Sequence, residues 1–228
     1  MDTQIESSLE KIAKDRKRTN IFRSLEQPTI AFLCEIMPSF ISPNMLTAIG
    51  FLGSVLVFYS FILAIQNPTY LLLGILGFAI QWFGDSLDGR VAYYRNIPKK
   101  WFGFALDMCM DWLSTIIIGI GFYYYLPVSH HIYVYTFITA YGWTMIIALL
   151  KYRITDKYEI DIEKFGPTEL RIVLCLILLV EVIHPGVLYY VAIALNVILY
   201  TLNFIDFYHL LQMGNAKDAI ENAQKNIQ

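Results

Sequence analysis

Long apolar windows without charge dominate the pattern of hydrophobic and polar positions along this chain. A helix that crosses a bilayer needs about 20 mostly apolar residues, and six windows have this length. They cover roughly residues 44–66, 69–92, 101–126, 131–150, 168–184 and 186–208. The pattern therefore predicts an all-α integral membrane protein with six transmembrane helices.

A shorter apolar segment precedes the first window. Pro28 to Phe40 is too short to cross a bilayer, with Glu35 inside it and Pro38 ending it. We expect an amphipathic helix that lies in the membrane interface. The chain then divides into a basic cytoplasmic tail with this interfacial helix (1–43), a six-helix membrane domain (44–210) and a polar cytoplasmic tail (211–228).

The composition agrees with this class of protein. Apolar and aromatic residues make up 57% of the 228 residues and charged residues 16%, against about 45–50% and about 25% in soluble domains. An ordinary soluble globule is therefore excluded. The three cysteines are scattered, with no CxxC or CxxH pattern, so we expect them to serve in packing.

The basic residues are distributed on one side of the predicted topology. All 17 lie before the first window, in or beside the second and fourth connections, or at the end of the chain. The connections at 126–131 and 184–186 have none. The positive-inside rule then places both termini and the even-numbered connections in the cytoplasm. The basic run at 11–18 either contacts anionic head groups or is a solvated tail.

Four aspartates interrupt the second and third windows. Asp85 and Asp88 are three residues apart, and Asp107 and Asp111 are four apart, so each pair shares one helix face. With a turn near residues 96–98, two antiparallel helices would bring all four carboxylates to the same depth. We therefore expect the four side chains to converge.

Four carboxylates without a matching set of basic residues at their depth are typical of a site for hard cations, one or two Mg²⁺ or Mn²⁺. Two such ions can clamp a diphosphate and stabilise charge on the attacking and leaving oxygens. Gly89 would let a phosphate or nucleotide approach the backbone, and Gly103 would let the second and third helices pack closely. Two alternatives are aspartates that only cap helix ends or face water, and a pathway for cations or protons.

These residues resemble the signature of the CDP-alcohol phosphotransferase (CDP-alcohol phosphatidyltransferase) family, D-x2-D-G-x2-A-R-x8 or 9-G-x3-D-x3-D. The matching positions are Asp85, Asp88, Gly89, Ala92, Gly103, Asp107 and Asp111. The sequence departs from the signature at Tyr93, where the family has Arg. Arg90 and Arg95 lie nearby, and which of them substitutes is open.

The resemblance implies a fold of six transmembrane helices, often a homodimer, with its active site open to the cytoplasm and the head-group layer. It also implies that the four aspartates surround two divalent cations, Mg²⁺ or Mn²⁺, and that Asp111 is the catalytic base. Asp88, Gly89, Ala92 and Gly103 would lie at the nucleotide.

A second stretch, Ser42 to Gly50, is similar to the P-N-x-L-T-x-x-G motif that the same family shows at the start of its first span. By itself it predicts a helix start, capped by Ser42 or Asn44, with Pro43 in the first turn. The resemblance implies that Asn44 and Thr47 contact the nucleotide.

Basic residues near the fourth connection are candidates for binding the acceptor. Lys151, Arg153 and Arg171 would suit an anionic acceptor such as a sugar phosphate or inositol phosphate, through fork-like phosphate contacts. Positive-inside topology alone also explains most of these charges.

The resemblance implies a transferase of phospholipid biosynthesis. It would move a phosphatidyl or other substituted phosphate group from a CDP-alcohol, with CDP-diacylglycerol as the expected donor, to an acceptor hydroxyl, and release CMP. Its partners would be these two substrates and membrane lipid, without nucleic acid. The alternative is a cation-coupled membrane carrier or a catalytically altered member of the same scaffold, and Tyr93 is the feature that favours altered activity.

Overall fold

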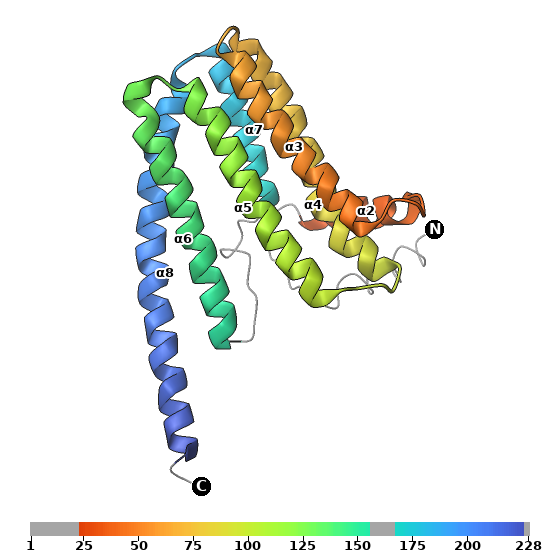
Figure 1. The fold of residues 1–228 in the computed structure, drawn as a ribbon, viewed down its shortest axis with the longest axis vertical. Helices are drawn as coiled ribbons and strands as arrows, with labels where there is room; N and C mark the ends of the chain where they lie inside the picture. The colour runs from red at the N-terminus through yellow and green to blue at the C-terminus, as the bar shows by residue number, and fades with distance from the viewer. Residues whose placement is uncertain (1–22, 156–166, 226–228) are drawn as a thin grey trace. The chain divides into compact units, whose positions relative to one another are not determined.

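The computed structural model describes residues 23–155 and 167–225, and these residues form helices without any strand (Figure 1). The helices are α2 (Arg23–Ile36), α3 (Pro43–Ala64), η1 (Pro68–Tyr70), α4 (Leu71–Tyr94), α5 (Lys100–Tyr125), η2 (Val128–His130), α6 (His131–Thr155), α7 (Pro167–Ile183) and α8 (Val187–Lys225). The prediction of an all-α protein is confirmed.

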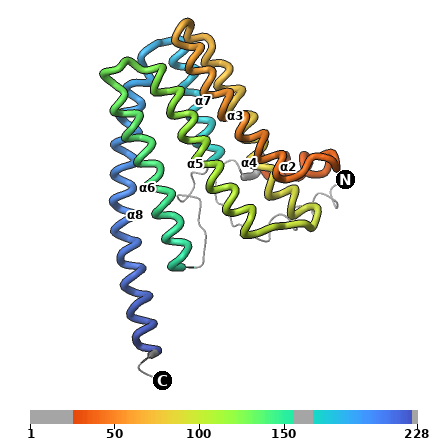
Figure 2. The backbone as a smooth tube through the Cα atoms, in the orientation of Figure 1, coloured from red at the N-terminus to blue at the C-terminus, as the bar shows by residue number. Residues whose placement is uncertain are grey.

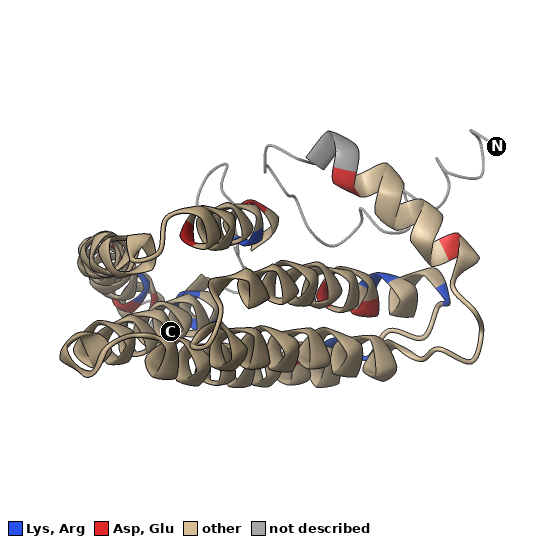
Figure 3. Ribbon diagram, turned by 90° about the horizontal axis from the view of Figure 1, so that it is seen from above, with Lys and Arg blue, Asp and Glu red and all other residues tan. Residues whose placement is uncertain are grey.

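Five helical segments among the described residues are long and apolar enough to cross a membrane. They are Pro43–Ala64, Pro68–Tyr94, Lys100–Tyr125, Val128–Thr155 and Val187–Gln224. Figure 3 shows how few charged residues interrupt them. The remaining expected span, the fifth at 168–184, corresponds to α7, which has 17 residues, fewer than the roughly 20 that a bilayer-crossing helix needs. The total of six spans therefore stays a prediction.

The segment before the first span is helical, with bounds that differ from those expected. Helix α2 begins at Arg23 rather than at Pro28, and it ends at Ile36, ahead of Pro38. Its side chains Ile30 and Cys34 are both 1% exposed and pack against α3 and α4. The location of α2 in a membrane interface stays a prediction, and the basic run at 11–18 lies outside the described residues.

The chain forms two compact units, each described separately below. The first contains α2, α3, α4, α5 and α7, and the second contains η2, α6 and nearly all of α8. Helix α8 continues without interruption for 39 residues, so the expected boundary between residues 210 and 211 falls inside one helix. The division of the chain into membrane and cytoplasmic parts stays a prediction.

In the first unit the backbones of α3 and α4 touch each other at glycines. A Cβ on Gly84 would lie 2.4 Å from the backbone N of Gly50 and the backbone O of Leu46. A Cβ on Gly53 would lie 2.6 Å from the backbone N of Gln81 and the backbone O of Gly77. Small residues permit such close approach of membrane helices. This contact sets the register of α4 against α3.

The predicted role of Gly103 in helix packing is wrong. A Cβ at this position would have no heavy atom within 4 Å, so the glycine is not needed for close contact with another helix. The chain does reverse between α4 and α5 as expected, with Asn96 in the left-handed region at φ 57° (Figure 2). Both helices pack against α3, and the tight glycine contact joins α3 to α4.

A buried carboxylate on α7 accepts hydrogen bonds from the end of α5 and from residues just after α7. Glu181 on α7 is 1% exposed and accepts hydrogen bonds from the Tyr125 hydroxyl (2.7 Å), the Gly186 N–H (2.8 Å) and the Leu188 N–H (2.7 Å). Gly186 has φ +103°, a conformation that favours glycine. The three donors satisfy a charge that would otherwise be costly to bury.

In the second unit, polar side chains join α6 to α8. Asn196 donates to the backbone O of Tyr133 and Asn203 to that of Ala140, each at 2.8 Å. The Thr144 hydroxyl donates to the Asn203 side-chain oxygen at 2.7 Å. The bonded residues are seven apart on both helices, a spacing that keeps one seam facing the partner helix. These bonds act between helices in the way expected of polar residues in membrane proteins.

The glycine contact predicts a large difference between two Gly→Ala variants. In Gly84→Ala the methyl group would meet backbone atoms at 2.4 Å, and overpacking of this kind costs about 1–3 kcal/mol. Gly214 on α8 has open space around its Cβ position, and Ala there is expected to stabilise the helix by about 0.5–1 kcal/mol. Thermal unfolding in detergent should show a lower midpoint for Gly84→Ala than for the wild type, and no decrease for Gly214→Ala. A midpoint for Gly84→Ala at or above that of Gly214→Ala would contradict the contact.

Burial predicts that Cys34 is unreactive in the folded protein. Burial raises the pKa of its thiol to about 11, and nearby Arg90 and Arg95 only partly oppose this. At pH 8 only about one thiol in a thousand would be ionised, and the thiolate is the nucleophile. In a Cys109→Ser/Cys175→Ser variant, maleimide should label Cys34 only after unfolding in SDS. Rapid labelling of the folded variant at pH 8 would show that α2 does not cover this side chain.

Candidate metal centre

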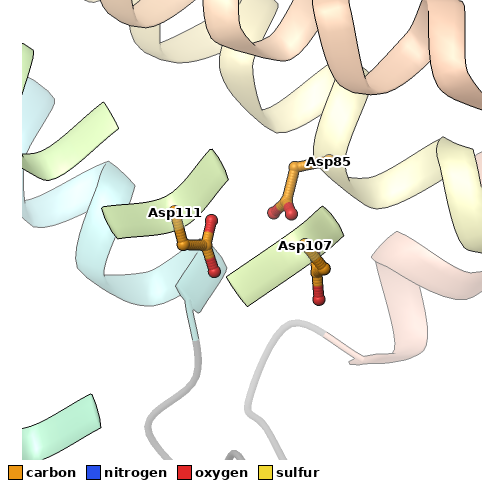
Figure 4. Close-up of side chains that lie close together, drawn as sticks. All are labelled: Asp85, Asp107 and Asp111. Atoms are coloured by element: carbon orange, nitrogen blue, oxygen red, sulfur yellow. The ribbon is translucent and has the colours of Figure 1, made fainter. Parts of the chain in front are cut away.

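Three of the four predicted aspartates meet in the first unit. Asp85 extends from α4, and Asp107 and Asp111 extend from α5. One carboxylate oxygen from each residue lies within 4.8 Å of the others, and all three residues are half-buried. Figure 4 shows Asp85 reaching from its helix toward the two aspartates of α5. We call these three residues the aspartate cluster.

Asp88 lies beside the cluster and has a different partner. The Thr47 hydroxyl on α3 donates a hydrogen bond of 2.6 Å to the Asp88 carboxylate. Both residues line the same small cavity as the cluster, together with Gly50, Phe51, Gln81, Met110 and Ser114. The cavity therefore contains all four predicted aspartates, with three of them close enough to share an ion.

The start of α3 brings Thr47 to this place. Ser42 caps the helix, since its hydroxyl accepts from the Met45 N–H at 3.2 Å, and Pro43 occupies the first turn. Of the two caps expected, the structure shows Ser42 in this role. Asn44 is exposed at the first turn and is not among the residues that line the cavity.

The predicted nucleotide-contacting glycines lie in open positions. Gly89 on α4 and Gly103 on α5 are exposed, and a Cβ on either would meet no heavy atom within 4 Å. Ala92, one turn after Gly89, is half-buried. The backbone of both helices is thus accessible to a ligand near the aspartates.

A guanidinium group contacts the cluster from a helix distant in sequence. Arg171 on α7 forms an ion pair with Asp85, with 2.6 Å between Nη2 and Oδ2. Arg171 is thus one basic residue beside the aspartates and does not amount to a set that matches the four carboxylates. Of the three predicted acceptor residues, Arg171 lies at the cluster, whereas Lys151 and Arg153 belong to α6 of the second unit.

The two arginines nearest Tyr93 are engaged with α2 and the connection that follows it. Arg95 donates to the backbone oxygens of Ile41 (2.5 Å), Met37 (3.1 Å) and Pro38 (2.8 Å). Arg90 lies 3.8 Å from the Glu26 carboxylate on α2 and donates to the Ser86 backbone oxygen. Both contacts hold α2 and the start of α3 against α4.

Sequence motifs did not reveal Gln81 and Ser54. Gln81 on α4 accepts from Arg171 Nε at 3.3 Å and donates to the Ser54 hydroxyl on α3 at 2.9 Å. One signal was available, because Gln81 lies four residues before Asp85 in an apolar stretch and therefore on the same helix face.

The donor set fits a hard divalent cation. Carboxylate oxygens are the ligands that Mg²⁺ and Mn²⁺ prefer. If all four carboxylates are ionised, −4 from them and +1 from the guanidinium give the cavity a formal charge of −3. In apolar surroundings such a charge needs compensation. The site is that of a helical membrane protein able to hold metal ions beside an open helix backbone.

Comparison with known proteins identifies the family. The sequence profile of the CDP-alcohol phosphatidyltransferase family matches residues 40–202. The chain belongs to this family. It is similar to the archaetidylinositol phosphate synthase of Pyrococcus horikoshii, with 43% identity over 83 residues, which are 36% of this chain and 41% of that protein. The match thus spans about two fifths of the curated relative.

Removing one carboxylate should weaken metal binding. We expect Asp107→Asn to bind Mn²⁺ at least about tenfold more weakly than the wild type. Even the loss of a residue that only hydrogen-bonds to a metal ligand lowers the metal affinity about 10–100-fold. Asp206→Asn is the matched control, because Asp206 is exposed on α8. Electron paramagnetic resonance of free Mn²⁺ measures the affinity without any substrate. Equal weakening in both variants would contradict a site at the cluster.

Proposed function

We propose that this protein is a transferase of phospholipid biosynthesis that moves a phosphatidyl or other substituted phosphate group from a CDP-alcohol to an acceptor hydroxyl and releases CMP. The observation that carries the proposal is the meeting of Asp85, Asp107 and Asp111, on two helices, in a chain whose family profile covers residues 40–202. CDP-diacylglycerol is the proposed donor. The name of the Pyrococcus relative, which denotes a lipid carrying an inositol phosphate, supports a lipid substrate.

Asp85, Asp88, Asp107 and Asp111 are the proposed ligands of two divalent cations, Mg²⁺ or Mn²⁺. When bound, such ions neutralise the diphosphate and stabilise charge on the attacking and leaving oxygens. The hydrogen bond from Thr47 holds one oxygen of Asp88 in place, which fixes the direction of its carboxylate. The cluster residues come from two helices that are both packed against α3, so their separation is set by rigid elements.

Asp111 is the proposed catalytic base. Its carboxylate accepts the proton of the acceptor hydroxyl as that oxygen forms a bond to the phosphorus on the alcohol side of the diphosphate. The bond between this phosphorus and the oxygen of CMP breaks, and CMP leaves with the electron pair. Asp111 then returns its proton to water. Asp111 lines the cavity, which supports this role because a base must lie within hydrogen-bond reach of the proton it takes.

The nucleotide is proposed to lie against the exposed backbone at Gly89 and Gly103, with Ala92 beside them and Asn44 and Thr47 at the start of α3. The open space at both glycines supports this placement. A side chain there would occupy the volume through which a phosphate approaches the helix.

An anionic acceptor is proposed, with Arg171 as its main contact and Lys151 and Arg153 as further candidates. The ion pair between Arg171 and Asp85 supports the role of Arg171, because it places a guanidinium fork at one of the three residues of the aspartate cluster. The inositol phosphate in the name of the relative makes a phosphorylated polyol the first acceptor to test.

The proposed membrane arrangement has six spans, with α7 as the fifth of them, α2 in the interface, and both termini and the aspartate cavity on the cytoplasmic side. The one-sided distribution of Lys and Arg supports this orientation. Residues 1–43, 44–210 and 211–228 are the proposed tail with interfacial helix, membrane domain and cytoplasmic tail. A homodimer is proposed on the family resemblance.

A second candidate is a carrier or a catalytically altered protein on the same scaffold. Tyr93 favours it, because the family signature has Arg there and the neighbouring Arg90 and Arg95 contact α2 and the connection after it. A carrier would move cations across sealed vesicles without any CDP-alcohol, whereas the transferase would release CMP.

The proposed function is tested by reconstituting the purified protein with Mg²⁺ or Mn²⁺ and following CMP. CDP-diacylglycerol and CDP-ethanolamine are each paired with inositol phosphate, inositol, glycerol phosphate and diacylglycerol. Release of CMP that requires both a metal and an acceptor supports the transferase. No CMP under any pairing, with the protein folded, would overturn it.

Asp111→Asn should abolish CMP release and leave binding of the CDP-alcohol largely intact. The amide keeps the shape of the side chain but cannot accept the proton at neutral pH, and loss of a general base costs about 10²–10⁴-fold in rate. Single-turnover assays measure the rate, and equilibrium binding of a labelled CDP-alcohol measures affinity. Normal turnover by this variant would show that another group is the base.

A further inference from the structure

Gln81 connects three helices around the aspartate cluster. On α4, its Nε2 donates to the Ser54 hydroxyl of α3 at 2.9 Å, and its Oε1 accepts from Arg171 Nε of α7 at 3.3 Å. Ser54 is fully buried, and Gln81 is half-buried. The amide therefore bridges a helix of the glycine contact to the guanidinium that pairs with Asp85.

The chemistry of the partners determines the orientation of this amide. A guanidinium has only donors, so the oxygen of Gln81 faces Arg171, and its NH₂ group is left for the Ser54 oxygen. Reversing the amide would place two donors against each other at Arg171. Only one orientation of the Gln81 amide therefore satisfies the hydrogen bonds to both Arg171 and Ser54.

Arg171 is held at two points by these contacts. Its Nε donates to Gln81, and its Nη2 lies 2.6 Å from Asp85 Oδ2. Because the guanidinium is planar, two contacts through different nitrogens fix the direction of its plane as well as its position. The contact with Gln81 therefore adds a constraint on orientation to the ion pair with Asp85.

The backbone of Gln81 cannot shift easily. A Cβ on Gly53 would lie 2.6 Å from the Gln81 backbone N, so α3 presses directly on this residue. The glycine contact therefore fixes the backbone of Gln81, and the hydrogen bond to Ser54 holds its side-chain amide.

We propose that Gln81 is a positioning residue that aims the Arg171 guanidinium at the phosphate group of an anionic acceptor beside the aspartate cluster. This inference rests on the proposed transferase function. The planar fork of Arg matches phosphate oxygens only in a defined orientation, and Gln81 supplies one of the contacts that set it. Gln81 thus acts on acceptor selectivity through Arg171 and does not contact the reacting atoms.

The test compares Gln81→Met with Gln212→Met in the full-length reconstituted protein. Met is close to Gln in length but cannot accept the Arg171 hydrogen bond well, and Gln212 is exposed on α8. With inositol phosphate, Gln81→Met should raise the acceptor KM about tenfold, the scale of one charge-assisted hydrogen bond. The KM for the CDP-alcohol and the kcat should change less than about twofold. Gln212→Met should match the wild type.

A double variant separates positioning from a general structural effect. In an Arg171→Gln background, Gln81→Met should add no further rise in the acceptor KM, because coupled residues are not additive. Ser54→Ala removes only a hydroxyl and should raise the same KM by a smaller factor, so it replaces Gln81→Met if that variant does not fold. An equal rise for both substrates, or a full effect in the Arg171→Gln background, would overturn the proposal.

Failure of the proposed transferase function and failure of the role proposed for Gln81 give different results. If the wild type releases no CMP with any donor and acceptor, the transferase function fails and the role of Gln81 fails with it. If the wild type is active and Gln81→Met has the wild-type acceptor KM, the function stands and this inference alone is overturned.

Discussion

The backbone contact between α3 and α4 is the constraint on which the rest of the first unit depends. Gly50, Gly53, Gly77 and Gly84 leave no space for a side chain between the two helices. Their approach holds Thr47 within hydrogen-bond distance of Asp88 and places Ser54 beside Gln81. Because α3 also packs against α5, the same helix positions both sets of aspartates. A cavity with four carboxylates is therefore built on a closely packed pair of helices.

Charged side chains near α3 and α4 contact polar or oppositely charged groups. Arg171 pairs with Asp85, and Thr47 donates to Asp88. Arg95 binds three backbone oxygens of the connection between α2 and α3, which holds this connection in place. The aspartate cavity still has more negative than positive groups, which is the property expected of a site for divalent cations. Among the described residues, Arg95 and Arg171 thus have identified partners.

Much of the fold was accessible from sequence, because helix length and the spacing of residues on one helix face are local properties. The apolar windows predicted the membrane-length helices, and the spacing of Asp107 and Asp111 predicted that both lie on one face of α5. The start of α2 and the role of Gly103 were predicted wrongly. Both depend on which neighbouring segment a residue packs against, and no local pattern contains that information.

The sequence by itself determined an all-helical membrane protein, the family signature and the aspartates as candidates for its metal centre. Only the tertiary structure decided that α3 is the helix in closest contact with α4, and that Asp88 pairs with Thr47. It also decided that Arg171, 86 positions after Asp85, supplies the guanidinium at the cluster. The physical reason is that helix periodicity acts over one or two turns, whereas partners from distant helices are selected by which faces can approach closely enough to touch.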